Sequence, residues 1–467
     1  MSKSEFRVLL AIAVAAVVIR LAVSASFKGH SYVAADPVKP ETEATYLKRG
    51  EIGLGDSEQY LLLGAGIRNR LSYSWSEDTS GEGLSTRGEV SRGNGKVGTG
   101  IPNTFRTPGY PLLLALLNGN VSAIVLVQAL LAGLTVFLTG LVGLRLFNSR
   151  VGFLGAALLA VDIPSIFSSG MVMSEVLFAF TVVLAAALVL GVVSRKPQAA
   201  SCKPLLAGLV LGFAVLVRPV ALFAFVPFGV ALAAKRNWRG LVLMLVAFSL
   251  LPGIWVARNY YHFHRFSLTS NGGYNLLYAN AASVLGGEQR ISQDSARIEL
   301  AHDFTARLAT DNPLELADLM TRKATSIILH DPLRYVWICL RGVPKVIAGI
   351  KSDDLVLRML YAKVSGTQGS VLLNRDYGST GVRLAIWLLA GFELLTAIAA
   401  FLLALISLAF RRWRAEKLML LVIGLYFVVA ALPFTDGRFR VPTMPFLYLA
   451  AATMLAGKPR RSEGEGA

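Results

Sequence analysis

The chain has 467 residues, of which 54% are hydrophobic and only 16% charged, and its mean hydropathy is +0.57. This composition excludes an ordinary soluble domain and indicates an integral membrane protein. The net charge of +17 does not point to a nucleic-acid partner, because no basic stripe with interleaved aromatic residues occurs and many-span proteins gather Lys and Arg in their inner loops. The two cysteines, Cys202 and Cys339, form no disulfide framework.

A first apolar helix is predicted from Val8 to Ala25, with Lys3 and Arg7 before it. The alternative is a secretory signal, since Val23-Ser24-Ala25 resembles a small-residue cleavage site. Arg20 favours a retained anchor, because an arginine without a role in an apolar helix raises the free energy of membrane insertion by about 2.5 to 3.5 kcal/mol. A retained helix can direct that charge to an external site.

A long polar segment, Ser26 to Arg106, follows this helix. Its part from Gly81 to Gly100 is rich in Gly, Ser and charge and is predicted to be a mobile insertion. The rest of the chain alternates apolar runs with polar connections. The apolar runs are Val121–Phe147, Val151–Phe167, Val176–Val193, Leu205–Val217, Val220–Ala234, Leu241–Ala257, Leu384–Phe410, Leu418–Phe434 and Val441–Leu455. With the first helix they predict about ten transmembrane spans, several of them short for an untilted crossing.

The cations orient these spans. If the N-terminus is cytoplasmic, basic clusters fall in every inner loop, as the positive-inside rule requires. They are Arg145 and Arg150; Arg195, Lys196 and Lys203; Lys235, Arg236 and Arg239; Arg411, Arg412, Arg414 and Lys417; and Lys458, Arg460 and Arg461. We therefore predict a multi-pass protein of the inner (plasma) membrane with both termini cytoplasmic. The expected parts are 1–25 (first transmembrane helix), 26–120 (external loop with juxtamembrane helices), 121–257 (transmembrane bundle), 258–383 (external helical segment), 384–456 (C-terminal transmembrane helices) and 457–467 (cytoplasmic tail).

Several charges remain near the predicted outer face and are candidates for a shared cavity. Taken singly, each can also be an interfacial residue that extends to water. The set is Arg20, Asp56, Glu58, Arg106, Asp162, Glu175, Arg218, Arg258, Asp436, Arg438 and Arg440. Arginine forks bind phosphate oxygens in pairs, and a carboxylate beside them can take a proton from an attacking hydroxyl. These residue types predict a transferase with a lipid-phosphate donor, and no nucleotide-binding signature suggests another energy source.

The same residues carry a resemblance to a known family. The chain resembles membrane glycosyltransferases of the GT-C fold, namely the bacterial relatives of dolichyl-phosphate-mannose protein mannosyltransferases and the aminoarabinose transferases that modify lipid A. The matching elements are Arg20-Leu21, Asp56 with Tyr60, Arg106-Thr107-Pro108-Gly109-Tyr110-Pro111, Ser174-Glu175, Arg218-Pro219, Arg258-Asn259, Asn271-Gly272-Gly273-Tyr274-Asn275 and Arg438-Phe439-Arg440-Val441-Pro442. The resemblance implies an all-helical GT-C-like fold with two large external segments.

The resemblance also implies roles for single residues. Asp56 falls where the family has its first-loop catalytic aspartate, and Arg106 where relatives contact the donor phosphate. Glu175 matches a second acidic position at which relatives often have Asp. Further donor-phosphate ligands are expected among Arg218, Arg258, Arg438 and Arg440, and further substrate contacts among Tyr60, Glu58, Glu175 and Asn259.

Other polar groups have simpler interpretations. His262 and His264 alternate with aromatic residues and predict an interfacial belt rather than a metal site. Asp353-Asp354 has the pattern of a paired-carboxylate site, but a solvated loop is the simpler interpretation. We therefore expect a glycosyltransferase without metal or other cofactor. It would move a sugar from a polyprenyl-phosphate-linked donor in the membrane lipid to an external protein, lipid or glycan acceptor, with inversion at the anomeric carbon. The alternative is a flippase or transporter of lipid-linked sugars, for which inverted repeats of the span pattern would be expected.

Overall fold

The computed structural model describes residues 1–27, 56–74, 102–193, 202–305, 310, 312–360, 380–410, 414–432 and 436–456. The predicted insertion Gly81–Gly100, the tail 457–467 and the cations Arg195, Lys196, Arg411 and Arg412 lie outside these residues. Within them the regular structure is helical, apart from an isolated antiparallel β-bridge between Ser74 and Pro102. The predicted all-helical class is therefore confirmed.

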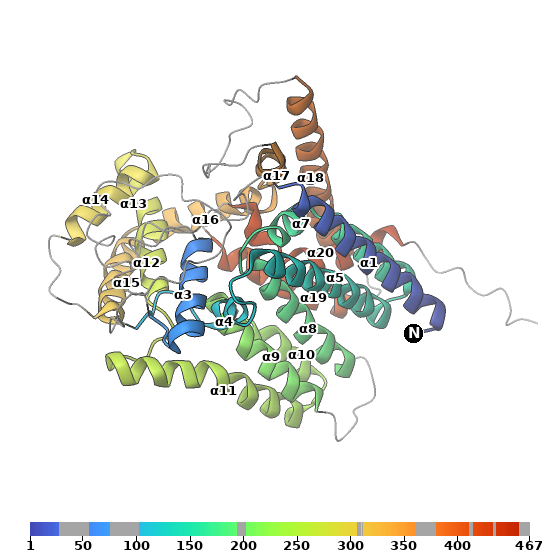
Figure 1. The fold of residues 1–467 in the computed structure, drawn as a ribbon, viewed down its shortest axis with the longest axis horizontal. Helices are drawn as coiled ribbons and strands as arrows, with labels where there is room; N and C mark the ends of the chain where they lie inside the picture. Colours follow the sequence, from blue (N-terminus) through green and yellow to red (C-terminus); the bar gives the residue numbers. More distant parts are fainter. Residues whose placement is uncertain are drawn as a thin grey trace, which may run out of the picture.

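The N-terminal half forms a helical bundle (Figure 1). Its helices are α1 (Lys3–Ala25), α3 (Asp56–Arg70), α4 (Gly109–Leu116), α5 (Val121–Leu146), α6 (Ser149–Ala160), α7 (Ile163–Ser169), α8 (Glu175–Val193), α9 (Lys203–Val217), the 3-10 helix η3 (Pro219–Phe223), α10 (Phe225–Ala234) and α11 (Trp238–Phe263). Small residues allow these helices to pack closely, as is common in membranes. A Cβ atom at Gly212 of α9 would lie 2.6 Å from the carbonyl oxygen of Phe248 in α11.

Four helices are long and apolar enough to cross a membrane, namely α1, α5, α11 and α18 (Thr380–Ser407). Shorter apolar helices accompany them, so the predicted count of about ten spans stays a prediction. The predicted single run Val151–Phe167 is instead α6 and α7, which meet at a bend of 56°. The bend follows from Asp162, whose carboxylate caps α7 by accepting from the Ser165 N–H, and from Pro164 at the start of α7.

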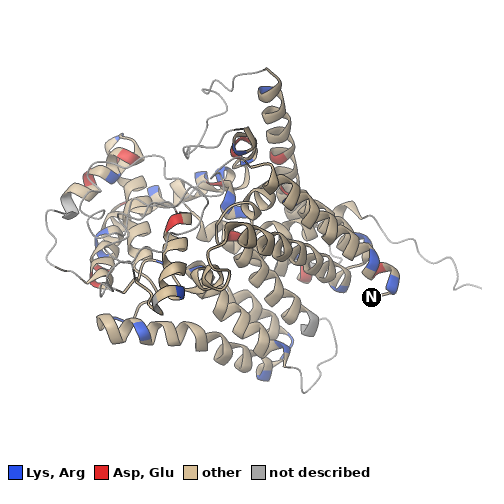
Figure 2. Cartoon of the chain, in the orientation of Figure 1, with Lys and Arg blue, Asp and Glu red and all other residues tan. Residues whose placement is uncertain are grey.

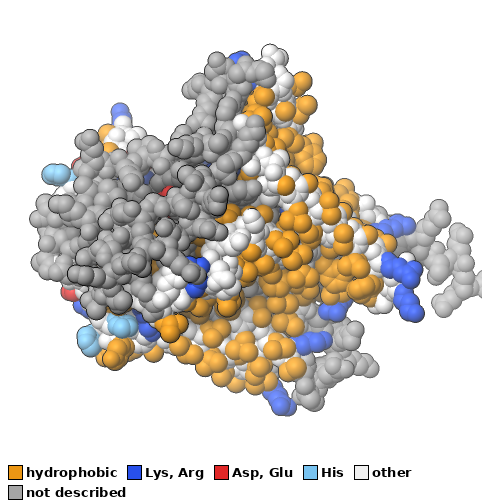
Figure 3. Space-filling model, in the orientation of Figure 1, with side chains coloured by type: hydrophobic (Ala, Val, Ile, Leu, Met, Phe, Trp, Pro, Cys, Tyr) orange, Lys and Arg blue, Asp and Glu red, His pale blue; other side chains and the backbone are white. Residues whose placement is uncertain are grey.

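The surface of the bundle is apolar. Val14, Leu134, Val246 and Leu395 belong to the four long helices, and each is half or more exposed. Figure 3 shows hydrophobic side chains spread over these helices, with Lys and Arg gathered at the end where the N-terminus lies. Figure 2 shows few charges along the bundle helices themselves. This distribution is that of a multi-pass membrane protein.

A second group of helices lies beyond the opposite end of the bundle (Figure 1). It consists of α12 (Asn271–Asn275), the π-helical turn η4 (Leu276–Ala281), α13 (Ala282–Gln289), α14 (Gln293–Thr305), α15 (Pro313–His330) and α16 (Pro332–Ile347). Leu277, Ala296 and Met320 belong to its own apolar core. The chain then returns to the bundle through α17 (Ser352–Leu360), α18, α19 (Arg414–Ala430), the 3-10 helix η6 (Gly437–Arg440) and α20 (Met444–Leu455). The candidate site lies where η6, α3 and the start of α8 meet.

Candidate active site

Asp56 lies in the first turn of α3, at the centre of a cluster of charged side chains. Its Oδ1 is 2.5 Å from Nη2 of Arg106, and its Oδ2 is 3.0 Å from Nη1 of Arg438. The Asp56 side chain is 29% exposed, so the carboxylate is open to an incoming substrate while it binds two cations. Three residues separated by up to 382 positions therefore meet at one point, and Asp56 and Arg106 are two of the predicted site residues.

The loop before α4 holds Arg106 in place. The Asn103 side chain accepts hydrogen bonds from the backbone N–H groups of Phe105 and Arg106, both at 3.1 Å. The Arg106 Nε donates to Gln59 Oε1 at 2.8 Å, and its guanidinium lies 5.1 Å from the centre of the Tyr60 ring. The fork of Arg106 is therefore already oriented toward Asp56.

Glu175, the first residue of α8, extends the cluster on the far side of Arg438. Its Oε1 is 2.7 Å from Nη1 of Arg218 and 3.9 Å from Nε of Arg438. Within the described part of the chain, Glu175 Oε2 and Arg438 Nε are buried and have no hydrogen-bond partner. Buried polar atoms are rarely left unpaired, so these two atoms keep hydrogen-bonding capacity that the described residues do not use.

Three guanidinium groups (Arg106, Arg218, Arg438) surround the carboxylates of Asp56 and Glu175, and Arg438 also lies 3.6 Å from a third carboxylate, Asp436. Burial raises the pKa of Asp56, but the charges of Arg106, Arg438 and Arg218 outweigh burial and hold that pKa well below its usual range. Asp56 is therefore ionised at neutral pH. Three guanidinium groups gathered at one partly exposed place suit a phosphate group.

Three predicted phosphate or substrate ligands lie outside this cluster. Arg258 donates to the carbonyl oxygens of Asn103 and Tyr73, and its guanidinium lies 4.7 Å from the Trp255 ring. Arg258 thus braces the loop that carries Arg106. The Asn259 amide donates to the carbonyl oxygens of Ser267 and Leu268, which fixes the chain after α11.

Arg440 is the third of them. Its Nη2 lies 2.8 Å from Glu393 of α18, and both side chains are only 1% exposed. The Arg440 fork also donates to the carbonyl oxygens of Ile347 and Gly349. Glu58 is partly buried in the first turn of α3. Tyr60 is buried, and its hydroxyl lies 3.3 Å from Ser174 Oγ.

Arg20 and Asp162 have packing partners of their own. The Arg20 guanidinium is fully buried and donates to Ser165 Oγ and to the carbonyl oxygens of Leu159 and Ala160. Asp162 accepts from the Tyr448 hydroxyl at 2.8 Å in addition to capping α7. Both residues therefore fix the bend between α6 and α7, and neither belongs to the Asp56 cluster.

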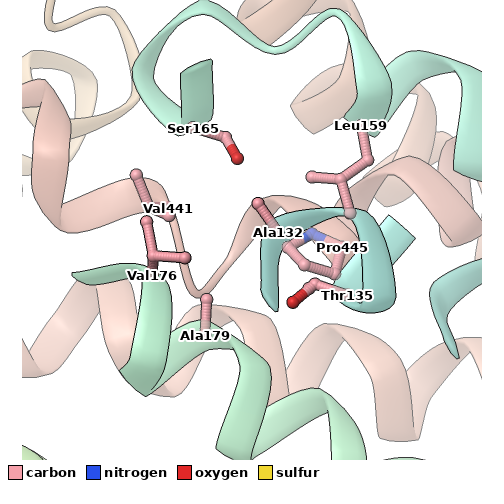
Figure 4. Close-up of a pocket in the computed structure, with 8 residues that line it drawn as sticks. All are labelled: Ala132, Thr135, Leu159, Ser165, Val176, Ala179, Val441 and Pro445. Atoms are coloured by element: carbon pink, nitrogen blue, oxygen red, sulfur yellow. The ribbon is translucent and has the colours of Figure 1, made fainter. Parts of the chain in front are cut away.

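A small cavity lies next to this bend, lined by Ala132, Thr135, Leu159, Ser165, Val176, Ala179, Val441 and Pro445 (Figure 4). The space between these side chains is roughly that of one water. It cannot hold a sugar or a lipid. No group of three His, Cys, Asp or Glu side chains with metal-binding geometry occurs among the residues that the structure describes.

Sequence reasoning missed several residues of this region. Gln59 orients Arg106, and Lys351 and Glu393 lie behind Arg438 and Arg440. The sequence does mark Glu393, because it is a lone carboxylate inside the 28-residue apolar helix α18. An unpaired charge there is costly, so a buried cationic partner could have been predicted. Gln59 and Lys351 carry no such signal.

The comparisons with known proteins agree with this fold. No curated protein matches the chain by sequence. Residues 101–261 match the dolichyl-phosphate-mannose-protein mannosyltransferase family. The resemblance predicted from the sequence is thereby confirmed for this region. It contains Arg106, Glu175, Arg218 and Arg258, while Asp56 and Arg438 lie outside the matched residues.

One solved structure has a similar fold over 97% of this chain. The Archaeoglobus fulgidus oligosaccharyltransferase tethered with an acceptor peptide has a TM-score of 0.51 at 16% identity, over 97% of this chain and 50% of that chain. This chain thus spans about half the length of that enzyme. ArnT from Cupriavidus metallidurans bound to undecaprenyl phosphate has a TM-score of 0.36 at 14% identity, over 95% of this chain and 78% of that chain. The fold is the mannosyltransferase-like, GT-C fold of membrane glycosyltransferases.

Proposed function

We propose that this protein is a glycosyltransferase that moves a sugar from a polyprenyl-phosphate donor to an acceptor outside the membrane. The observation that carries the proposal is the position of Asp56 between the guanidinium groups of Arg106 and Arg438, with Arg218 beside them. The match of residues 101–261 supports the donor class, because the name of that family contains a dolichyl-phosphate-linked mannose.

The three arginines are proposed to bind the donor phosphate. Guanidinium groups keep their charge in a partly buried site and offer paired N–H groups to oxyanions. They stabilise the phosphate further as it becomes the leaving group, because negative charge then increases on its oxygens. Arg258 has a supporting role in this proposal, since it holds the loop of Arg106. Arg440 supports the site through the chain before α17.

Asp56 is proposed to be the general base. The acceptor hydroxyl forms a bond to the anomeric carbon as the bond from that carbon to the phosphate oxygen breaks. The bonding electron pair leaves with the polyprenyl phosphate, and the hydroxyl proton passes to Asp56. A single displacement of this kind inverts the anomeric configuration.

Donor binding makes Asp56 a stronger base. In the free site, Arg106 and Arg438 hold the pKa of Asp56 below its usual range. A phosphate that binds the same guanidinium groups takes over their positive charge and adds negative charge nearby. Both changes raise the pKa of Asp56. The carboxylate therefore gains proton affinity only when the donor is in place, which couples donor binding to activation of the acceptor.

The direction of the reaction follows from the orientation of the chain. The cation clusters predict cytoplasmic termini, and α3, which begins at Asp56, lies on the side of the bundle away from the N-terminus (Figure 1). We therefore place the reaction on the external face of the inner membrane. The proposed acceptor is a protein, lipid or glycan. For the oligosaccharyltransferase of similar fold, the bound acceptor is a peptide.

Membranes that contain the protein provide a direct test. They are given undecaprenyl-phosphate-mannose labelled in the sugar, and label is followed into products separated from the donor, in both the solvent-insoluble and the lipid fractions. Labelled product should form with the native protein and fall to background with Asp56→Asn. Equal product formation by the two proteins would contradict the proposal.

A further inference from the structure

Lys351 is a buried cation directly behind the proposed phosphate site. It lies between α16 and α17 and is 9% exposed. Its Nζ is 3.1 Å from Asp354 Oδ2 and 3.0 Å from Asp436 Oδ1, and it lies 5.8 Å from the centre of the Phe167 ring. An amine this buried is found only where carboxylates pair with it.

The backbone around Lys351 is fixed from two sides. Both carboxylate oxygens of Glu393 accept from the Lys351 N–H at 3.0 Å, and Oε2 also accepts from the Ser352 N–H at 3.0 Å. Arg440 binds the preceding carbonyl oxygens of Ile347 and Gly349. A buried ion pair with all these hydrogen bonds holds Lys351 in one position relative to η6.

Gly349 brings this loop still closer to η6. A Cβ atom at Gly349 would lie 2.6 Å from the backbone nitrogen of Gly437. The loop before α17 therefore packs directly on the turn that carries Asp436 and Arg438, with no room for a side chain between them.

Asp436 competes for Arg438. Its Oδ2 is 3.6 Å from Nε of Arg438, while Asp56 and Glu175 lie 3.0 Å and 3.9 Å from the same guanidinium. Three carboxylates thus share one arginine. Asp436 also caps η6 by accepting from the Arg438 N–H at 2.9 Å, so it cannot turn away from Arg438 without losing the cap.

Lys351 is the main cation that pairs with the Asp436 carboxylate. Burial raises the pKa of Asp436, but Lys351 and Arg438 outweigh burial and lower it. Burial lowers the pKa of Lys351, but Asp436 and Asp354 outweigh burial and raise it. Both groups are therefore ionised at neutral pH. If Lys351 lost its charge, Arg438 would be drawn toward Asp436 and away from the open side of the site.

We propose that Lys351 is a positioning residue for the donor phosphate: by neutralising Asp436, it leaves the guanidinium of Arg438 available to the donor. This inference rests on the proposed function, because it concerns the same phosphate site. It assigns no contact between Lys351 and the donor. The effect passes entirely through Asp436.

The test is an equilibrium titration of the purified full-length protein in detergent with undecaprenyl phosphate, comparing five proteins besides the native one. Lys351→Met removes the charge and keeps the length, and Lys351→Arg keeps the charge. Asp436→Asn removes the competing charge and retains an oxygen for the cap. The double variant combines Lys351→Met with Asp436→Asn. Lys345→Met is the matched control, since Lys345 is exposed near the end of α16.

Lys351→Met should weaken binding by about tenfold, an effect expected from one partly screened charge, and Lys351→Arg should recover most of it. Asp436→Asn should bind as tightly as the native protein or more tightly. The double variant should regain near-native binding, which a merely structural role for Lys351 does not predict, because two damaged contacts would then add. Lys345→Met should leave binding unchanged.

Two results overturn the inference. Native binding by Lys351→Met shows that Asp436 does not need the lysine. Weak binding by both Lys351→Met and the double variant shows that Lys351 acts through packing alone. Failure of the native protein itself to bind undecaprenyl phosphate has a different meaning: it contradicts the proposed function, and the inference falls with it.

Discussion

Replacing Asp56 with asparagine separates proton transfer from donor binding more sharply than any other change in the site. Asp56→Asn keeps the shape of the side chain and one acceptor oxygen. It removes the negative charge that holds Arg106 at 2.5 Å and Arg438 at 3.0 Å. It also places an amide N–H₂ opposite one of these guanidinium donors, where no hydrogen bond can form.

The variant should lose turnover but keep or gain donor affinity. Loss of a general base lowers kcat by about 10² to 10⁴, or about 2.7 to 5.4 kcal/mol in the activation free energy. The donor phosphate no longer competes with a carboxylate for Arg106 and Arg438, so its Kd should be unchanged or lower. A fall in kcat without a rise in donor Kd is the expected signature of a lost catalytic base.

The assay measures initial rates of sugar transfer from undecaprenyl-phosphate-mannose and, separately, binding of undecaprenyl phosphate. Asp318→Asn is the matched control, because Asp318 is exposed on α15, away from the site. The reasoning is refuted if Asp56→Asn transfers sugar at a near-native rate. It is also refuted if the variant loses donor binding in proportion to its activity, since Asp56 would then be part of the phosphate site.

Three further predictions concern Arg106, the orientation of the chain and Arg440. Arg106→Ala should lose donor binding and activity, and Arg106→Lys should recover only part of each, because a lysine supplies charge without the paired N–H groups; full recovery in a donor titration would argue against bidentate contact. An impermeant thiol reagent applied to intact cells should modify Cys339 and spare Cys202, which are partly buried and exposed, respectively; labelling of Cys202 alone would reverse the predicted orientation. Arg440→Leu should destabilise the fold by about 3 to 5 kcal/mol, because it leaves Glu393 buried without its cation; an unchanged thermal midpoint would contradict that cost.

Residue types and their order along the chain were enough to find part of the site. Asp56 and Arg106 were both predicted for one membrane face from their residue types and positions, and the structure brings them into contact. The acidic start of α8 was also found, where Glu175 pairs with Arg218. The resemblance implied the all-helical fold, and the long apolar runs separately predicted membrane-spanning helices.

The sequence could not separate Arg438 from Arg440. They lie two positions apart in η6, and both are arginines near the same predicted membrane face. The 3-10 turn directs Arg438 toward Asp56 and Arg440 toward Glu393 of α18. Which of two neighbouring arginines faces a site depends on the geometry of one turn and on partners from distant helices. Neither is visible in the local sequence.

The bend between α6 and α7 was missed for a related reason. The run Val151–Phe167 has the composition of one short span, and hydropathy alone does not show that Asp162 starts a new helix. The structure shows the cap to Ser165 and a second partner, Tyr448, from α20. A capping signal inside an apolar run, here Asp162 followed by Pro164, is the feature that would have predicted the break.

The central claim is that this site takes its sugar from a lipid phosphate. The most direct measurement offers the purified, reconstituted protein polyprenyl-phosphate sugars and nucleotide sugars in separate reactions and follows transfer to acceptors in a membrane extract. We predict transfer from a polyprenyl-phosphate sugar and none from a nucleotide sugar. Transfer from a nucleotide sugar alone would contradict the lipid-phosphate donor. Movement of a lipid-linked sugar across vesicles without transfer from any donor would instead identify the protein as a flippase.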